Sequence, residues 1–334
     1  MPDPIFRLPP YRIDAMLAAS EVTQRIDWGL LLYGVPDAWK ETRGKGVKVA
    51  VLDTGIDRAH PDLFDQVIAA RDFTGSPLGT EDHVGHGSHV AGIIAARDND
   101  RGVVGVAPEA KLLIGKVLGD DGGGQGEWVE DGIRWAAKQK ADVISLSLGS
   151  PQAHSGMNRA IEYATGMGIF VCCAAGNSGP NNQQIDYPAR WPEVLAIAAT
   201  RNDGKLSDFS SRGPEVDFAA PGEGILSTWP GGRYSRLSGT SMSCPFVAGV
   251  VALLVARHKA PGVHNTPLVT LADLVEHLGR HAIDAGPAGT DQGFGRGIVK
   301  VGELLAAERA AAPPAPTPDM GQEIEIFGVN IHTP

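Results

Sequence analysis

Short apolar runs alternate with longer amphipathic segments through the middle of the chain. Five of the runs are rich in Val, Ile, Leu and Ala along their whole length, as strands buried on both faces are. Such strands, separated by crossover helices, are typical of a mainly parallel sheet with helices on both faces. The predicted fold is therefore an α/β three-layer sandwich. The expected strands are residues 47–52, 111–118, 142–148, 169–175 and 193–200.

One segment between these runs predicts a crossover helix. Residues 127–140, EWVEDGIRWAAKQK, place Val129, Ile133, Ala136 and Lys140 at helical spacing. Acidic residues come early in the segment and lysines come late, as the helix dipole prefers. Glycines gather where the predicted strands end, and open α/β sheets place their chemistry at those carboxyl ends.

Composition and charge restrict the class of protein. The chain has 334 residues, 43% apolar and 20% charged, which suits a large globular core. Its net charge of −10 argues against non-specific binding to nucleic acid or to an anionic membrane. The start lacks the basic and apolar regions of a signal peptide, and three cysteines, two of them adjacent, are a poor basis for a disulfide framework. We expect an acidic cytoplasmic protein.

The first candidate for chemistry is Asp53, which ends the apolar run in VAVLDTGID. A carboxylate at the tip of a hydrophobic strand is costly unless a neighbour uses its charge. A turn aspartate that caps the next element is the alternative.

The second candidate is His86, between glycines at the start of the Ala/Ile-rich segment GHGSHVAGIIAA. His83, His86 and His89 are three residues apart, so metal binding is an alternative. The usual cysteine, histidine or acidic partners of a zinc site do not accompany them. We expect His89 to be a packed helix histidine.

The third candidate is Ser241, which precedes a long apolar helix with Pro245 in its expected first turn. A serine there is often only a helix cap. The same position also places the serine oxygen beside unpaired N–H groups that stabilise developing negative charge.

The chain order Asp, His, Ser is that of the subtilisin triad. The blocks VAVLDTGID, HGSHVAGIIAA and GTSMSCPFVAG resemble the three signatures of the subtilisin-like serine proteases (subtilases), and the resemblance extends from Gly46 to Val301. It implies that Ser241 is the nucleophile, His86 the base and Asp53 the group that orients the imidazole. Asn177, in CAAGN, resembles the side-chain donor of the family's oxyanion hole, paired with the backbone N–H of Ser241.

The sequence departs from the family pattern at two positions, and neither departure nor the three cysteines argues against the assigned triad. Ser88 replaces the usual threonine after His-Gly, and Phe246 replaces a common histidine after the proline. Neither changes a triad member. Cys172 and Cys173 lie on one expected strand, whose alternate side chains face opposite ways, and Cys244 is expected to be a small buried residue.

The resemblance also implies how substrate binds. An extended peptide would add a strand between two edges and be recognised through its backbone, which favours broad specificity. Asp186 falls near the family's pocket floor, where a carboxylate would favour Lys or Arg; a loop aspartate facing solvent is the alternative. The expected edges are Ser147, Leu148 and Gly149 on one side and Gly122, Gly123 and Gly124 on the other, with Ala174, Ala175 and Gly176 lining the pocket.

A structural calcium ion is the one cofactor that the resemblance implies. Oxygen ligands of mixed charge suit Ca²⁺, and an ordinary polar turn is the alternative. The corresponding positions are Gln24, Asp62 and Asn99, with the backbone carbonyls of Arg97, Arg101 and Val103.

The N-terminal stretch FRLPPYRID resembles the inhibitory extension of intracellular subtilisins. Leu8, Pro10 and Tyr11 match its Leu-Ile-Pro-Tyr-like stretch, with Pro9 in place of Ile. Proline donates no backbone hydrogen bond, so such a segment can fill a cleft without efficient cleavage. The hypothesis is that residues up to about Ser20 keep the enzyme latent; a merely packed tail is the alternative.

The chain therefore divides into an extension (1–22), a catalytic domain (23–306) and a Pro-rich linker with a tail (307–334). Ile324 and Ile326 suggest a short strand for a sheet edge or for the partner subunit of a homodimer. The predicted function is broad-specificity hydrolysis of protein or peptide substrates by a serine endopeptidase.

Two other classes compete with the protease. One is a pseudoenzyme that only binds peptides, against which the intact triad argues. The other is a nucleotide-binding protein that uses LGDDGGGQG, which lacks the Lys-Ser/Thr of a P-loop.

Overall fold

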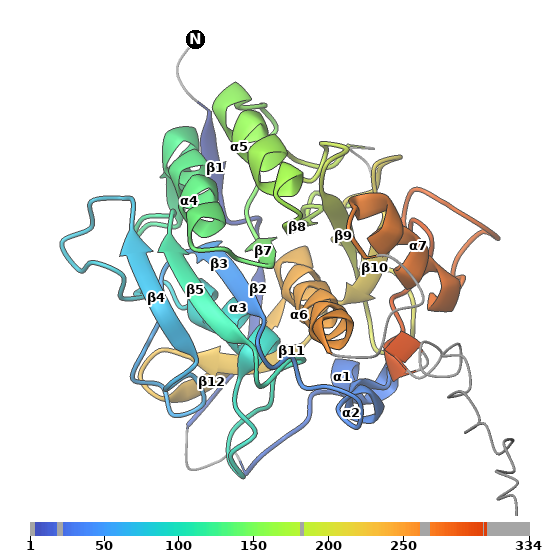
Figure 1. Ribbon diagram of the computed structural model, residues 1–334, viewed down its shortest axis with the longest axis horizontal. Helices are drawn as coiled ribbons and strands as arrows, with labels where there is room; N and C mark the ends of the chain where they lie inside the picture. The colour runs from blue at the N-terminus through green and yellow to red at the C-terminus, as the bar shows by residue number, and fades with distance from the viewer. Residues whose placement is uncertain (1–3, 19–22, 181–183, 261–267, 303, 306–334) are drawn as a thin grey trace, which may run out of the picture.

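The computed structural model describes residues 4–18, 23–180, 184–260, 268–302 and 304–305. Its centre is a seven-stranded sheet in the order β10-β9-β8-β7-β3-β5-β4, and all its neighbouring strands are parallel. Figure 1 shows this twisted sheet crossing the molecule. The predicted α/β fold is confirmed. The strands are β3 (Lys48–Asp53), β4 (Val67–Asp72), β5 (Lys111–Lys116), β7 (Val143–Leu146), β8 (Phe170–Ala174), β9 (Leu195–Thr200) and β10 (Phe218–Pro221).

Five of these strands coincide with the five predicted apolar runs, and the two strands at the sheet edges do not. β4 is only partly buried, and its apolar run, Val67 to Ala70, is only four residues long and is followed by Arg71 and Asp72. β10 is buried but has four residues and ends at Pro221, which reads as a loop in the sequence.

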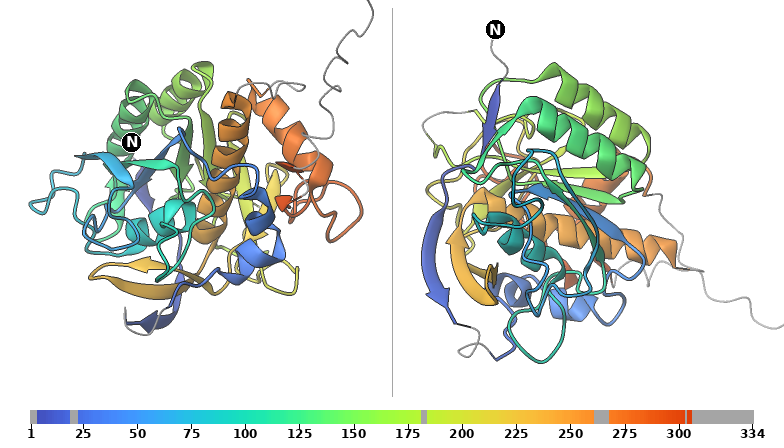
Figure 2. Two further views of the ribbon diagram at one scale, coloured as in Figure 1. Left: turned by 60° about the horizontal axis from the view of Figure 1, so that its bottom comes forward. Right: turned by 90° about the vertical axis from the view of Figure 1, so that its left-hand side faces the viewer.

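Helices cover both faces of the sheet (Figure 2). α4 (Gly126–Lys138) and α5 (Ser155–Gly166) pack together on one face, and α3 (His86–Ala95) and α6 (Thr240–Lys259) lie on the other. The expectation for Lys140 was wrong. α4 ends at Lys138, and the exposed Lys140, with φ 58°, takes the left-handed position that closes the helix: its N–H donates to the Ala137 carbonyl, and the next N–H donates to the Ala136 carbonyl. The remaining helices are α1 (Trp28–Leu32), α2 (Val35–Ala38) and α7 (Leu271–His281).

α6 is the long apolar helix behind Ser241. Its length and hydropathy would suffice to cross a membrane, but its apolar window is buried inside the protein. Pro245 is the sixth residue of α6 rather than part of its first turn. Since proline has no N–H, it cannot bond to the carbonyl of Ser241, and the hydroxyl of Ser147 donates to that carbonyl instead, at 3.0 Å.

Two smaller sheets lie beside the main one, and the N-terminal segment contributes a strand to each. β2 (Arg12–Leu17) pairs antiparallel with β12 (Arg233–Ser238), which pairs with β11 (Ile225–Trp229). β1 (Ile5–Arg7) pairs antiparallel with β6 (Gly123–Gln125). The right-hand view of Figure 2 shows this blue segment running along one side of the molecule.

Candidate functional site

Asp53 and His86 meet at the carboxyl end of the central sheet. Asp53 is the last residue of β3 and His86 the first of α3, and both side chains are buried. The Nδ1 atom of His86 lies 2.8 Å from Oδ1 and 3.0 Å from Oδ2 of Asp53. An Nδ1–H donated to the carboxylate leaves Nε2 as the basic nitrogen of the ring.

Local backbone geometry requires glycine on each side of this histidine. Gly85 has φ 95°, and a Cβ on it would fall 2.4 Å from the ring of Trp229. A Cβ on Gly87 would fall 2.3 Å from the carbonyl oxygen of Gly55, on the loop after Asp53. The start of α3 can therefore approach the end of β3 closely enough for the Asp53–His86 bond.

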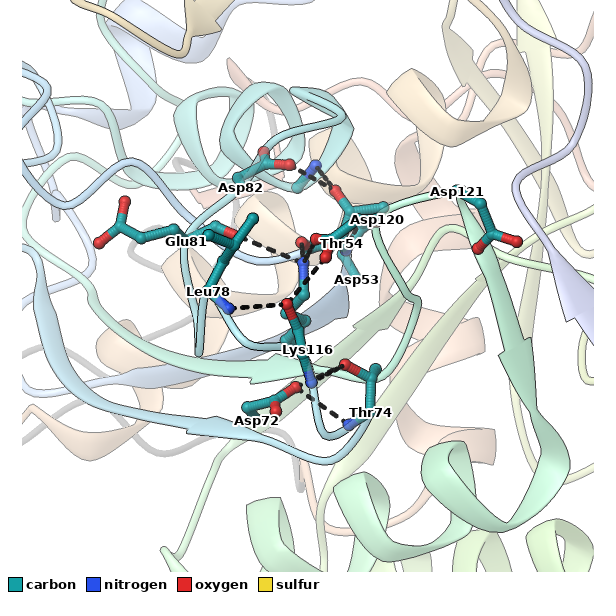
Figure 3. Close-up of polar contacts among 12 residues, drawn as sticks. Asp53, Thr54, Asp72, Thr74, Leu78, Glu81, Asp82, Lys116, Asp120 and Asp121 are labelled. Carbon is teal, nitrogen blue, oxygen red and sulfur yellow. Dashed lines mark hydrogen bonds and ion pairs between the residues drawn. The ribbon is translucent and has the colours of Figure 1, made fainter.

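A buried carboxylate that the sequence analysis missed, Asp82, organises the loop before His86. Its Oδ1 accepts from the Thr54 hydroxyl and the Gly85 N–H, both at 2.8 Å. Its Oδ2 accepts from the backbone N–H and the hydroxyl of Ser88, both at 2.7 Å. Figure 3 shows Asp82 near Thr54. In the sequence, Asp82 is only an acidic residue shortly before HGSH. Its role could not be predicted, because its hydrogen-bond partners come from separate segments of the chain.

Ser241 and Asn177 converge at the start of α6. The Asn177 side-chain oxygen accepts from the backbone N–H of Thr240 at 2.9 Å and from its hydroxyl at 2.8 Å, which fixes the amide beside Ser241. The hydroxyl of Ser241 donates to the carbonyl of Ser147 at 3.4 Å. His86 Nε2 is buried without a hydrogen-bond partner among the described residues. The hydroxyl of Ser241 is therefore bonded to Ser147 and not to His86 in this structure.

The N-terminal segment lies between the two predicted substrate edges. Arg7 and Gly149 exchange backbone hydrogen bonds of 3.0 and 2.9 Å, and the Leu8 N–H donates to the Gly122 carbonyl at 3.2 Å. The antiparallel pairs of β1 include Arg7 with Gly123 and Phe6 with Gly124. Three glycines of one edge and Gly149 of the other thus contact this segment. The other two predicted edge residues have different contacts. The Ser147 hydroxyl donates to the Ser241 carbonyl, and Leu148 is buried.

The same segment reaches the candidate catalytic groups. The Asn177 amide donates to the carbonyl of Pro10 at 2.8 Å. The Tyr11 ring lies 5.1 Å from the His86 imidazole, centroid to centroid. Desolvation, and then the charges of Asp53 and Asp82, raise the pKa of Tyr11. Pro9, between Leu8 and Pro10, lines the cleft described next.

A cleft of about 880 Å³ adjoins Pro9, Pro10 and Gly149 and includes Asp186 in its wall. A Cβ on Gly176 would lie 3.1 Å from Oδ2 of Asp186. The pKa of Asp186 is raised by desolvation. The residues predicted to line the pocket lie outside the wall of this cleft: Ala174 and Ala175 are buried, and Gly176 has φ 105°.

The residues predicted for calcium lie close together. Gln24 donates to the Asp98 side chain at 2.6 Å, and Asn99 donates to Asp62 at 3.2 Å. The chain around Gln24 bridges the loop at Arg101 and Val103, and Arg97 donates its backbone N–H to the Asp62 carbonyl. The carboxylate of Asp62 is buried and accepts from the Asn99 amide at 3.2 Å and from the Val103 N–H at 2.9 Å, so its oxygens, which are of the kind that suit a hard cation, are bonded within the protein. The described residues hold no group of three or more His, Cys, Asp or Glu side chains suited to a metal.

The other histidines and the cysteines have packed or exposed positions. His83 is exposed, and His89 is buried with Nε2 3.1 and 3.0 Å from the carbonyls of Ile225 and Ser235. Desolvation lowers the pKa of His89 to about 3. Burial raises the pKa of Cys244 to about 11, which disfavours the nucleophilic thiolate, and Cys172 and Cys173 are also free and buried.

A parallel α/β sheet that carries a buried Asp–His pair beside a helix-terminal serine is the framework of the subtilisin-like hydrolases. The profile described as the subtilase family matches residues 44–297. The chain belongs to the subtilase family and is a subtilisin-like serine endopeptidase.

Three relatives show how far this similarity extends. An intracellular serine protease of Paenibacillus polymyxa is 47% identical over 252 residues, covering 73% of this chain and 76% of the relative. The major intracellular serine protease of Bacillus subtilis is 47% identical over 235 residues, covering 68% of this chain and 74% of the relative. Thermitase of Thermoactinomyces vulgaris is 41% identical over 247 residues, covering 74% and 88%.

Proposed function

We propose that Asp53, His86 and Ser241 hydrolyse peptide bonds through an acyl-enzyme. The observation that carries this proposal is the buried Asp53–His86 pair with Ser241 and Asn177 at the adjoining helix terminus. His86 Nε2 takes the serine proton as the serine oxygen attacks the carbonyl carbon. The imidazolium then protonates the leaving amine, and water hydrolyses the ester by the same route.

Asn177 stabilises the charge that develops on the attacked oxygen. Its amide already donates to a peptide carbonyl, that of Pro10, at 2.8 Å. The backbone N–H of Ser241 is the proposed second donor. Fixed donors of this kind need no reorganisation as the negative charge forms.

Labelling by a fluorophosphonate tests the proposal. We expect Ser241 to be modified, and both labelling and peptide cleavage to be lost in Ser241→Ala. A buried control, Ser243→Ala on the same helix, should keep its label, since Ser243 donates to the Ala220 carbonyl. Labelling that persists in Ser241→Ala would assign the nucleophile elsewhere. A pseudoenzyme would show neither reaction in any variant.

Substrate recognition follows from the two strand edges. An extended peptide can take the place of the N-terminal segment and bond to Gly122 and Gly149 through its backbone, as Leu8 and Arg7 do. Such recognition reads few side chains and supports broad specificity. Asp186, in the wall of the cleft, would favour Lys or Arg before the scissile bond.

The N-terminal extension, residues 1–22, holds the enzyme latent in this proposal. Its carbonyl at Pro10 engages Asn177, its Tyr11 covers His86, and Ser241 is turned toward Ser147. Cleavage of the held segment is disfavoured because the nucleophile is bonded away from the base. Removal of the segment would open both edges and both catalytic groups.

A calcium ion is the proposed structural cofactor. Gln24, Asp62 and Asn99 would bind it together with the backbone carbonyls of Arg97, Arg101 and Val103. The ion would join residues next to the extension to the catalytic domain, 23–306. It supplies stability and takes no part in the chemistry at Ser241.

The cytoplasm is the proposed location. The two 47% identical relatives are named as intracellular proteases, and the three buried cysteines are free. The expected strand at Ile324 and Ile326, and with it the evidence for a homodimer, lies outside the described residues.

A further inference from the structure

Lys116 is a fully buried lysine at the carboxyl end of β5, opposite Asp53 in the parallel register. Its ammonium donates to the Thr54 carbonyl at 2.6 Å, the Glu81 carbonyl at 3.2 Å and the Asp120 carboxylate at 2.8 Å. Figure 3 shows Lys116 among these three partners.

Packing alone does not explain a charge at this position. The four residues before Lys116 in β5 are apolar and buried, so an apolar side chain would continue the strand. Removing an ammonium from water is costly unless its donors are satisfied. Here the three donors have three acceptors, which indicates a position built to hold the charge.

The three acceptors come from the three loops that form the site. Thr54 directly follows Asp53. Glu81 directly precedes Asp82, which organises the loop of His86. Asp120 lies in the loop that continues to the substrate edge at Gly122, and Ser76 donates to its other oxygen at 2.8 Å.

We propose that Lys116 and Asp120 are positioning residues. Lys116 holds together the loops that carry Asp53 and His86. Asp120 fixes the substrate edge at Gly122–Gly124 relative to those two loops. This rests on the proposed triad and substrate edge. Asp120 is 34% exposed, so its removal disturbs the loop rather than the core. The hydrogen bond to Lys116, foremost, lowers the pKa of Asp120, which keeps the carboxylate charged.

The two residues should have separable effects. Asp120→Ala frees the edge but leaves two of the three Lys116 bonds, so it should affect only substrates long enough to pair with that edge. Lys116→Met leaves the carbonyls of Thr54 and Glu81 without this donor, so it should affect every substrate. A merely structural pair would change stability without this dependence on substrate length.

The test compares kcat and KM for a hexapeptide and for a single-residue acyl ester, using full-length protein incubated until its activity is constant. For Asp120→Ala we expect KM for the hexapeptide to rise about fivefold. The kcat for the hexapeptide, and both kcat and KM for the ester, should stay within about twofold of the wild-type values. Lys116→Met should lower kcat about tenfold on both substrates. Asp120→Glu should restore the hexapeptide KM to within about twofold.

Asp37→Ala and Lys40→Met are the matched controls and should leave kcat and KM unchanged. Asp37, on α2, and Lys40, just after α2, form an exposed ion pair. Equal changes on ester and hexapeptide in Asp120→Ala, or none, would overturn the role of Asp120. Unchanged kcat in a folded Lys116→Met, judged by its thermal midpoint, would overturn that of Lys116. If wild type cleaved neither substrate even after residues 1–22 had been removed, the triad itself would be wrong.

Discussion

The aromatic ring of Tyr11 lies 5.1 Å from the imidazole of His86. The adjoining carbonyl, that of Pro10, accepts from the Asn177 amide. The chain's own N-terminal segment therefore occupies the place where the proposed base and the proposed oxyanion donor would meet a substrate. This relationship yields the first prediction.

Weakening the segment should activate the full-length protein. The Leu8 side chain packs near Gly122, and Leu8→Asp places a charge there. We expect an initial rate of peptide cleavage about tenfold above wild type, since the cleft is occupied less. Leu31→Asp, at an exposed position on α1, is the control. Mass spectrometry at each time point records the N-terminus, and equal initial rates with intact chains would contradict latency.

Replacing Asn177 should slow turnover without preventing folding. We expect Asn177→Ala to lower kcat by about 10²–10³ with a smaller change in KM, because the donor acts on charge that forms in the transition state. Asn158→Ala removes a similar amide on α5, where it bonds to Glu162, and should leave kcat unchanged. The thermal midpoint separates catalysis from the loss of the Thr240 contacts. A kcat within twofold of wild type would remove Asn177 from the mechanism.

Side-chain preference should depend on Asp186. Between peptides with Arg or Phe before the scissile bond, we expect wild type to favour Arg, and Asp186→Asn to reduce the ratio of kcat/KM about tenfold. Glu276→Gln, an exposed acid on α7, is the charge-matched control. A strong preference of wild type for Phe would place the carboxylate outside the primary pocket.

Stability should fall in acid because His89 is buried uncharged. Its folded pKa, about 3, lies below its unfolded value near 6.5, so the unfolded chain binds the extra proton between these values. Below pH 6.5 the free energy of unfolding should fall by up to about 1.4 kcal/mol per pH unit from this residue. Asp217, whose pKa is raised to about 6, opposes this trend above pH 4.

Comparing wild type with His89→Gln isolates the histidine, because Asp217 is common to both. Urea unfolding at pH 7.5, 6 and 5 should give a steeper loss for wild type than for the variant. Parallel curves would show that His89 is not the cause.

Calcium should stabilise the fold at the loop around Asn99. Chelation should lower the thermal midpoint, since an ion at one hundred times its Kd adds about 2.7 kcal/mol. Gln24→Ala should reduce the calcium-dependent shift, and Gln152→Ala, at an exposed position, should not. Equal midpoints in calcium and chelator would refute the site.

The sequence by itself determined the parallel core and indicated which chemical groups are candidates for catalysis. Five continuous apolar runs predicted five central strands because doubly buried strands carry no polar alternation. Asp53, His86 and Ser241 stood out because each lies at one end of an apolar element and either next to a glycine or two residues from one. The segment from Leu8 to Tyr11 was singled out because Leu8, Pro10 and Tyr11 match the inhibitory stretch of intracellular subtilisins, and its inhibitory role stays a prediction.

Only the tertiary structure decided how these groups meet. The edge strands β4 and β10, the partners of Asp82 and the buried ammonium of Lys116 depend on contacts between residues distant in the chain, which no local pattern encodes. The rotation of Ser241 toward Ser147 and the contact of Tyr11 with His86 have the same origin. A side chain's direction follows from the neighbours that satisfy its polar atoms, and the fold alone brings those neighbours together.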